Sequence, residues 1–318
     1  MINALIFNTS LLQPNTTVVV GLSGGPDSVC LLHYLATHKD RLNIRVIAAH
    51  LNHEWRTNAH EDVLFCKQLC DNLQITFVAK KASELNFTPK DNGSKEAIGR
   101  ALRRHFFTIV AQEHNATTIA LGHHQQDQVE TFFIRLIRGT TVTGLGCMKE
   151  ADGLYIRPLL KTSKTDILKY LKEHTLPSMY DSTNDSHDFL RNRIRLRLVP
   201  ALMECDARAE QKVINVIQTL QETEQFLAEL TQEAFVTVFN GTVLDLKKLF
   251  KLNHYLQKRV IIAWLYAYKS SFTLSHSFLT EILRFLKRPD GATHILSPEW
   301  SITKKKHKAQ LILRLKSA

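Results

Sequence analysis

The sequence lacks paired cysteines, a long apolar run and a basic leader. Its five cysteines are scattered, and no two of them form a Cys-x-x-Cys pair. This spacing argues against a disulfide framework, a zinc ribbon or an iron–sulfur site, and it fits a reducing cytoplasm. No stretch approaches the roughly 18 to 20 consecutive apolar residues of a membrane span, and the first residues have no basic segment of a signal peptide. We therefore expect a cytoplasmic protein with no membrane partner and no cleaved leader.

Two common nucleotide-binding motifs are also missing. A Walker-type loop needs Gly-Lys-Ser or Gly-Lys-Thr, and neither tripeptide occurs in the chain. Gly144 and Gly146 begin the three-glycine pattern of a dinucleotide fold, but Lys149 stands where the third glycine is needed. The 318 residues, 44% hydrophobic and 22% charged, are typical of a globular protein with two domains.

Acidic residues are scarce in the last part of the chain. Residues 247–318 hold 15 Lys and Arg against 3 Asp and Glu, whereas residues 1–246 hold 26 against 27. The formal net charge of +11 therefore comes entirely from the last part. Such segregation favours a polyanion partner, because neutralising phosphates releases their counterions. The alternative is an ordinary solvated surface.

A short turn after the first apolar run is the feature around which the chain is organised. The β-branched run ends at Gly21, and an apolar-periodic helix starts near Asp27. Free N–H groups of the turn and of the first helical turn would point at one place, which makes an anion site, usually for phosphate. The alternative is a plain glycine turn with Asp27 as the helix cap. The turn consists of Ser23, Gly24, Gly25, Pro26, Asp27 and Ser28.

Strand and helix patterns alternate through the first half of the chain. Further strands are predicted at 45–50, 75–78, 117–121 and 155–157, and helices at 58–71, 94–113 and 125–138. This alternation predicts an α/β fold with a doubly wound parallel sheet. Ligands of such sheets bind outside the carboxyl ends of the strands. We therefore expect Ser23, His50 and Gly122, which all follow strand ends, to lie on one rim.

The loop at residues 50–56 has a His-x-x-His spacing that suggests a metal. No carboxylate or cysteine partner stands at usual zinc spacing, so we favour a nucleotide-contact loop with Arg56 as an anion contact. A polar surface loop is the alternative.

The segment at residues 122–131 carries more ionisable groups. Asp127 and Glu130 are three residues apart on a predicted helix and share a face, where they would hold Mg²⁺ or an ammonium group. His123 and His124 would stabilise phosphate charge or transfer a proton. The alternative is an ordinary helix start with polar caps.

Four arginines alternate in the segment 191–197. On a helix, Arg191 and Arg195 face one way, and Arg193 and Arg197 face the opposite way. One pair would reach phosphates and the other would bind the body of the domain; a solvated basic helix is the alternative.

The second half of the chain predicts a linker and a smaller domain. We expect a catalytic domain at 1–206, a linker helix at 207–236 and a basic α+β domain at 237–318. In the last of these, helices are predicted near 247–269 and 275–286, followed by short strands. The sharpest basic patch lies on a predicted hairpin and comprises Lys304, Lys305, Lys306 and Lys308.

Several segments together resemble known families. The turn at 23–28 resembles the SGGxDS loop of the N-type ATP pyrophosphatases, or PP-loop enzymes, which have a Rossmann-like sheet. Residues 50–56, 96–107 and 122–131 resemble the HxxHxxR, E-x-x-x-R-x-x-R-Y and GHHxDDxxET segments of the tRNA(Ile)-lysidine synthases. Residues 135–139, 157–160, 177–184 and 191–195 continue the match, which covers about two thirds of the chain in order.

The resemblance implies an ATP- and Mg²⁺-dependent ligase. This family adenylates the C2 oxygen of the wobble cytidine in the CAU anticodon of tRNA(Ile) and then joins L-lysine to C2, releasing AMP and pyrophosphate. It implies that Asp27 binds Mg²⁺ and that Asp127 and Glu130 bind lysine. The implied catalytic residues are Asp27, Asp127, Glu130, His123, His124 and Arg193. The implied ATP-binding residues are Ser23, Gly24, Gly25, Pro26, Asp27, Ser28, His50, Arg100 and Gly122. The implied tRNA-binding residues are Arg191, Arg195, Lys304, Lys305, Lys306 and Lys308.

Two departures and three alternatives accompany this hypothesis. Gln126 stands where the family has the first Asp of its pair, and His105 replaces a Tyr. We expect the C-terminal domain of longer family members to be absent here. A tRNA thiolase, another N-type amidating enzyme and an inactive tRNA-binding relative are the alternatives. The sequence leaves the oligomeric state open, with a homodimer among the partners considered.

Overall fold

The computed structural model describes residues 5–89, 94–179, 189–268, 275–289 and 291–314. The chain divides into unit 1, Met1–Leu220, and unit 2, Gln221–Ala318. This boundary falls inside the long helix α9 (Ala209–Val238), and therefore inside the segment predicted as a linker.

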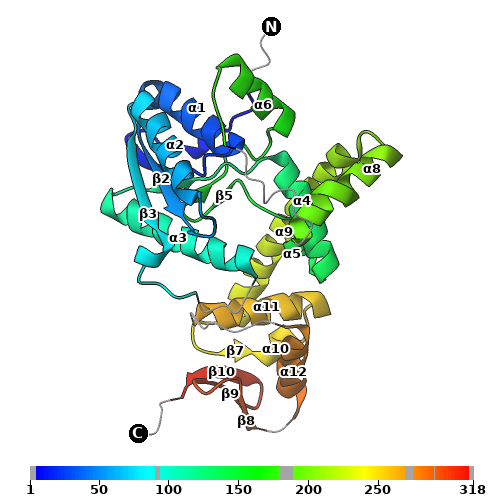
Figure 1. The fold of residues 1–318 in the computed structure, drawn as a ribbon. Coiled ribbons are helices and arrows are strands. Elements are labelled where there is room, and N and C mark those ends of the chain that lie inside the picture. Colours follow the sequence, from blue (N-terminus) through cyan, green and yellow to red (C-terminus); the bar gives the residue numbers. More distant parts are fainter. Residues whose placement is uncertain (1–4, 90–93, 180–188, 269–274, 290, 315–318) are drawn as a thin grey trace. The chain divides into compact units, whose positions relative to one another are not determined.

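Unit 1 contains a six-stranded sheet with the order β3-β2-β1-β4-β6-β5, and its strands are coloured from blue to green in Figure 1. The strands are β1 (Thr16–Gly21), β2 (Ile44–Asn52), β3 (Thr76–Lys81), β4 (Thr118–Ala120), β5 (Ala151–Asp152) and β6 (Tyr155–Ile156). All neighbours pair in parallel except β5 and β6, which are antiparallel. Because β1 lies between β2 and β4, the carboxyl ends of these three strands meet at one edge of the sheet.

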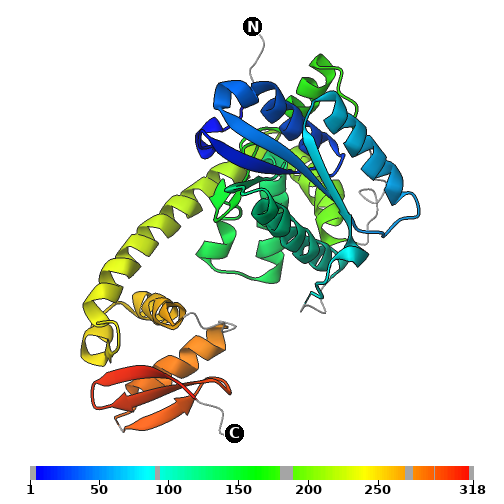
Figure 2. The same ribbon diagram turned by 90° about the vertical axis from the view of Figure 1, so that its left-hand side faces the viewer.

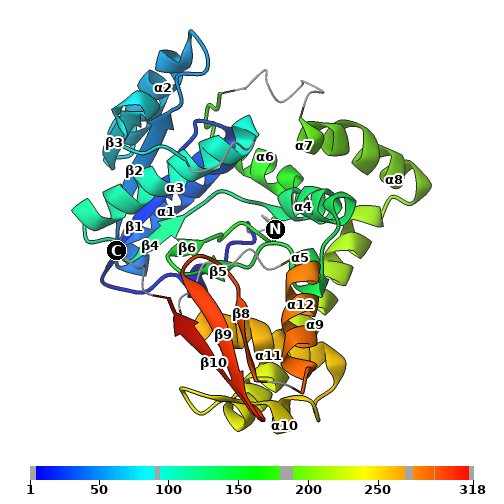
Figure 3. The same cartoon turned by 90° about the horizontal axis from the view of Figure 1, so that it is seen from below.

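Helices cover both faces of this sheet. Val18 and Val20 of β1 pack with α1 (Pro26–Leu42), α2 (Ala59–Asn72) and α6 (Lys164–Glu173) on one face. Val19 points the other way and packs with α3 (Lys95–Glu113). Helix α3 contacts β1, β2 and β4, and Figure 3 shows it beside these strands. The side-chain alternation of a strand thus supplies a core to each face.

The remaining α-helices that the structure describes in unit 1 follow the fourth strand. They are α4 (Gln125–Arg138), α5 (Val142–Leu145), α7 (Leu190–Arg193), a π-helical turn (Ile194–Leu198), α8 (Val199–Cys205) and the first part of α9. Val129 of α4 and Ile214 and Ile217 of α9 form a separate small core.

Unit 2 is a four-stranded antiparallel sheet with helices on one side (Figure 2). The strand order is β7-β10-β9-β8, with β7 (Leu244–Asp245), β8 (Ala292–Ile295), β9 (Trp300–Lys305) and β10 (Lys308–Leu313). The helices α10 (Leu246–Leu249), α11 (His254–Ala267) and α12 (His276–Lys287) pack with the end of α9 around the fully buried Trp264.

The predicted fold class is confirmed, but the prediction of one helix in unit 2 is wrong. The pattern at 247–269 predicts a single helix, but the structure has α10 and α11 with a break between them. Asn253 causes the second start, because its side chain accepts a hydrogen bond from the Tyr255 N–H and caps α11. Among the described helices, none has the length and apolarity needed to cross a membrane.

Candidate functional site

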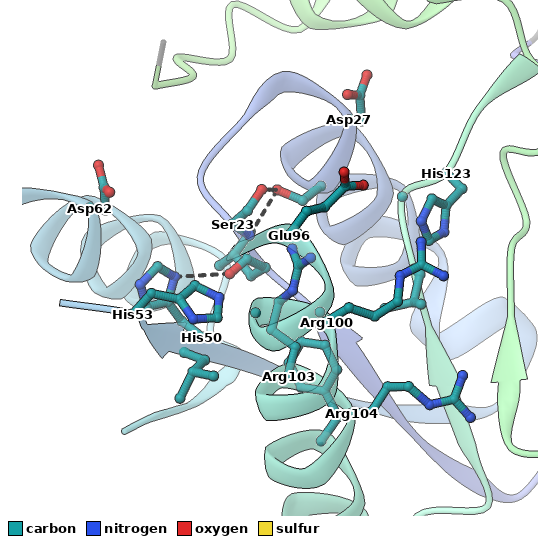
Figure 4. Close-up of a pocket in the computed structure, with 18 of the residues that line it drawn as sticks. Ser23, Asp27, His50, His53, Asp62, Glu96, Arg100, Arg103, Arg104 and His123 are labelled. Carbon is teal, nitrogen blue, oxygen red and sulfur yellow. Dashed lines mark hydrogen bonds between the residues drawn. The ribbon is translucent and has the colours of Figure 1, made fainter. Parts of the chain in front are cut away.

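A cavity of about 610 Å³ opens at the carboxyl ends of β1, β2 and β4. Ser23, His50 and Gly122, which follow these strands, all line it, so the predicted rim is confirmed. In Figure 4, His50 and His53 lie on one side of Ser23, and His123 lies on the other. Part of the segment 177–184, which was matched from sequence, lies outside the described residues.

The turn after β1 is closed by its own serines. The Ser28 hydroxyl donates to the Gly25 carbonyl (3.0 Å), while the Ser23 and Gly25 N–H groups donate to the Ser28 and Ser23 hydroxyl oxygens (3.1 and 3.4 Å). Gly24 has a φ of +83°, which residues with a side chain rarely adopt. Pro26 then occupies the first turn of α1, where no N–H is needed. Such a compact turn at a helix start suits a phosphate group.

Gly122 lets the end of β4 touch the start of α1. A Cβ at this position would lie 2.9 Å from the backbone carbon and oxygen of Asp27. Any larger residue would therefore push the turn away, because the contact is with backbone and not with a flexible side chain. Gly122 thus fixes the distance between the phosphate-type turn and the segment that follows β4.

Two carboxylates flank one imidazole at this contact. Asp27 Oδ2 lies 3.7 Å and Asp127 Oδ2 lies 3.6 Å from Nε2 of the buried His124. The His124 N–H donates to Asp127 Oδ2 at 2.9 Å. The other oxygen of Asp27 pairs with Lys164 Nζ at 2.5 Å. The structure thus unites the predicted residues Asp27, His124 and Asp127, and it adds Lys164.

The residues present fit Mg²⁺ bound together with a phosphate. No group of three metal-binding side chains occurs in the part of the chain that the structure describes. Mg²⁺ nevertheless needs only one or two protein carboxylates when substrate phosphates supply further oxygens. Asp27 meets that need beside the turn, and Asp127 flanks the same imidazole.

The histidines of the cavity are held neutral. Burial lowers the pKa of His123 to about 4, and nearby Arg157, Arg100 and Arg191 act in the same direction while Asp127 opposes them. Burial, Arg103 and His50 lower the pKa of His53 to about 4. Burial also lowers the pKa of His50, whose Nδ1 lies 2.9 Å from the Leu22 carbonyl. Because a carbonyl only accepts, His50 Nδ1 carries the proton and its Nε2 is an acceptor.

Asp127 stays ionised despite its burial. Burial opposes the charged form, but His124, His123 and Arg191, together with the His124 N–H, outweigh it and lower the pKa. A carboxylate with a lowered pKa is a good partner for a cation and a weak base.

Arginines form the opposite wall of the cavity. Arg100, Arg103 and Arg104 extend from α3 (Figure 4). Burial, and to a smaller extent neighbouring arginines, lower the pKa of Arg100 and Arg103. Of the described residues that line the cavity, eight are Lys or Arg and five are Asp or Glu. Nε of Arg157 and Nδ1 of His123 are buried without a hydrogen-bond partner among the described residues. An excess of enclosed cations, together with the unsatisfied donor of Arg157, fits a polyphosphate ligand.

Glu130 lies outside the lining of the cavity and binds two arginines. Its carboxylate, which is 2% exposed, pairs with Arg195 Nε at 2.6 Å and with Arg191 Nε at 3.0 Å. Arg191 and Arg195 share a helix face, as the sequence predicts, and both also line the cavity. Arg193 is exposed and lies outside this lining.

Gln126 is occupied by structural hydrogen bonds. Its Oε1 accepts from the Lys164 N–H at 2.9 Å, and its Nε2 donates to Glu210 Oε2 at 3.0 Å. It therefore connects the starts of α6 and α9, and it does not line the cavity.

Sequence reasoning missed Lys164, Arg103, Arg157 and His53 as site residues. Arg103 and Arg157 fall inside motifs that were recognised, and His53 is the second histidine of the His-x-x-His loop. Lys164 is different, because nothing near it in the sequence signals a site; it reaches Asp27 across 137 residues.

The basic hairpin of unit 2 is present, with one difference. Lys305, Lys306 and Lys308 are exposed at the β9–β10 turn. Lys304 is 3% exposed, because it lies on the core side of β9 with Ile302. Lys304 is therefore not part of the exposed basic surface that the sequence predicts.

The cysteines do not form a reactive group. Cys30, Cys66, Cys70 and Cys147 are buried, and burial raises the pKa of the first three thiols to about 12 and that of Cys147 to about 11. None of the five lines the cavity among its described residues.

Comparisons of the sequence with known proteins agree on one family. The sequence profile of the PP-loop domain matches residues 2–202. The chain is 35% identical over 295 residues to a tRNA(Ile)-lysidine synthase of Clostridium acetobutylicum, covering 89% of this chain and 59% of that protein. It is 36% identical over 222 residues to one of Clostridium tetani, covering 68% of this chain and 47% of that protein. The chain thus spans about half to three fifths of the length of these relatives.

A solved structure shares the fold. The U34-tRNA thiolase NcsA from Methanococcus maripaludis, determined with its 4Fe-4S cluster, matches 68% of this chain and 75% of its own with a TM-score of 0.58. At 18% identity this likeness supports the architecture alone.

Proposed function

This chain belongs to the PP-loop domain family, and on that premise we propose that it ligates L-lysine to the wobble cytidine of the CAU anticodon of tRNA(Ile), using ATP. The reaction adenylates the C2 oxygen of cytidine with loss of pyrophosphate, and the lysine ε-amine then displaces AMP. The observation that carries the proposal is the meeting of a closed serine–glycine turn, two carboxylates and a wall of arginines in one cavity.

The turn at 23–28 and α1 would hold the β- and γ-phosphates. Their anionic oxygens would face the N–H groups of the turn and the positive end of α1. Arg100 and Arg103 would neutralise the remaining negative charge from the opposite wall. His50, with Nε2 as an acceptor, suits the exocyclic amine of a nucleobase.

Asp27 and Asp127 would each bind one cation of the reaction, Mg²⁺ and the ammonium group of lysine respectively. Mg²⁺, when bound, would offset the charge that develops on the leaving pyrophosphate. Asp27 is the proposed protein ligand, and Asp127 is proposed to hold the ammonium group of lysine. The ammonium group would first lose one proton to water, which frees the nitrogen lone pair for attack on C2. A weak base suffices for the second proton, because the amine becomes much more acidic once it has bonded to C2. Neutral His123 would contact the phosphate or the adenylate without adding charge.

Glu130 is proposed to orient Arg191 and Arg195 instead of contacting lysine directly. Both of its oxygens already bind these arginines, which line the cavity. In unit 2, exposed Lys305, Lys306 and Lys308 would bind tRNA phosphates and leave base recognition to the cavity.

The test is release of AMP from ATP with lysine and an unmodified CAU-anticodon tRNA(Ile) transcript, with each component omitted in turn. We expect release to require all three, with lysine retained in the RNA. Binding of tRNA without AMP release would identify an inactive relative. A thiolase is not favoured, because four thiols are buried with raised pKa values and none lines the cavity.

A further inference from the structure

The carboxylate proposed to hold Mg²⁺ already has a cationic partner. Asp27 Oδ1 lies 2.5 Å from Lys164 Nζ, and Lys164 is the first residue of α6. The two side chains are 28% and 33% exposed, so water reaches the pair without separating it. An ammonium group in this place repels a divalent cation that approaches the same carboxylate.

The backbone of Lys164 is held in register with Asp27. Helix α6 packs against α1 (Figure 1), and Ile167 and Leu171 share a core with Leu31 and Leu35. The Ser163 side chain caps α6, and Gln126 accepts the Lys164 N–H at 2.9 Å. The ammonium group is thus carried on a flexible stem from a fixed point.

We propose that Lys164 guards Asp27, so that Mg²⁺ binds there only together with a polyphosphate. Without a polyphosphate, the ammonium group pairs with the carboxylate and excludes the metal. When a polyphosphate enters the turn, its negative charge attracts the ammonium group, and the carboxylate becomes available to the metal. This inference rests on the proposed function, because it assumes that the turn binds polyphosphate.

Gln126 acts in this scheme as a positioning residue. It bridges Lys164 and Glu210 and thereby fixes the point from which the lysine stem reaches Asp27. Loss of the amide would loosen that point without removing either charge.

The experiment measures Mn²⁺ binding by electron paramagnetic resonance, with and without pyrophosphate. The full chain is compared with Lys164→Gln, Lys164→Arg and the control Lys169→Gln, which alters an exposed lysine of the same helix that pairs with Glu173. We expect wild type to bind Mn²⁺ at least about tenfold more tightly when pyrophosphate is present. Lys164→Gln is expected to bind Mn²⁺ alone about five- to tenfold more tightly than wild type, and to lose most of the enhancement by pyrophosphate. Lys164→Arg and Lys169→Gln should resemble wild type, and Gln126→Ala should lie between.

Two further results separate the possible failures. Asp27→Asn should abolish the pyrophosphate-enhanced binding; if it does not, the metal lies elsewhere and the inference is overturned. Equal Mn²⁺ affinity in wild type and Lys164→Gln, with pyrophosphate still bound, overturns the guarding role alone. If neither pyrophosphate nor ATP binds to wild type, the proposed function fails and the inference fails with it. Thermal melting of each variant verifies that it is folded.

Discussion

The cavity of unit 1 and the basic hairpin of unit 2 use charge in opposite ways. In and beside the cavity, charged groups are paired: the buried Glu130 binds two arginines that line the cavity, Asp27 binds Lys164, and burial keeps His123 neutral. On the hairpin, Lys305, Lys306 and Lys308 face water. Enclosed charges act through geometry, whereas exposed charges act through their number.

The difference sets the size and kind of effect that a substitution should have. Removing one enclosed group leaves its partner uncompensated in a place that water reaches poorly. Removing one exposed lysine weakens a diffuse attraction that salt already screens. Four experiments test this contrast, and they run from the largest expected effect to the smallest.

Asp27→Asn should lower the rate of AMP release by about a thousandfold, because the amide cannot offset charge through a metal or bind a cation. ATP-dependent AMP release in the presence of lysine and tRNA is the measurement. Asp40→Asn, at an exposed position of the same helix, is the matched control and should retain full activity. Comparable loss in both variants would contradict the assignment.

Glu130→Gln should lower the free energy of unfolding by about 3 kcal/mol, because Arg191 and Arg195 would keep their charges without a buried counter-ion. Urea unfolding followed by circular dichroism measures this. Glu96→Gln is the control, since Glu96 also contacts Arg191 but its side chain is 42% exposed. A change within about 0.5 kcal/mol for Glu130→Gln would show that the arginines are not clamped.

His123→Asn should make the fold less sensitive to acid. The pKa of His123 is about 4 in the folded chain, against 6.5 for a free histidine, so only the unfolded state takes up this proton between those values. The stabilisation from neutral His123 is therefore complete above pH 6.5 and is lost as pH falls toward 4. Between pH 7 and pH 4.5, the variant should lose about 2 kcal/mol less stability than wild type in urea titrations. Parallel loss in both proteins would refute a neutral His123.

Replacing Lys305, Lys306 and Lys308 together by Gln should weaken tRNA binding only about tenfold near physiological salt. The slope of log affinity against log salt should fall by about 2, because each lysine–phosphate contact releases less than one counterion. Lys304→Met is the control; that side chain is 3% exposed, so the slope should not change. A loss of AMP release at saturating tRNA would mean that the hairpin does more than bind phosphates.

The sequence predicts well those features that follow from local patterns along the chain. The parallel sheet follows from alternating strand and helix patterns, and the meeting of Ser23, His50 and Gly122 follows from their place after strand ends. The common face of Arg191 and Arg195 follows from helix geometry. The burial of Lys304 was not predicted, although Lys304 is two residues from the buried Ile302 on one strand and therefore shares its face.

Long-range pairing is what the sequence does not reveal. Asp27 is 137 residues from Lys164, and Glu130 is 65 residues from Arg195. Neither pair has a local spacing that signals it, and several other lysines and arginines were equally available as partners. The role of Gln126 is hidden in the same way, since its two hydrogen bonds join three helices that are far apart in the sequence.

Because four of the five thiols are buried, the remaining exposed thiol is available for selective chemical labelling. Alkylation needs an accessible thiolate, which burial and raised pKa values deny to Cys30, Cys66, Cys70 and Cys147. Cys205, at the end of α8, is exposed. A maleimide dye added to the native chain at neutral pH should therefore attach at a single known position, without any engineered cysteine. The natural sequence is therefore suited to fluorescence measurements that test the proposed tRNA binding.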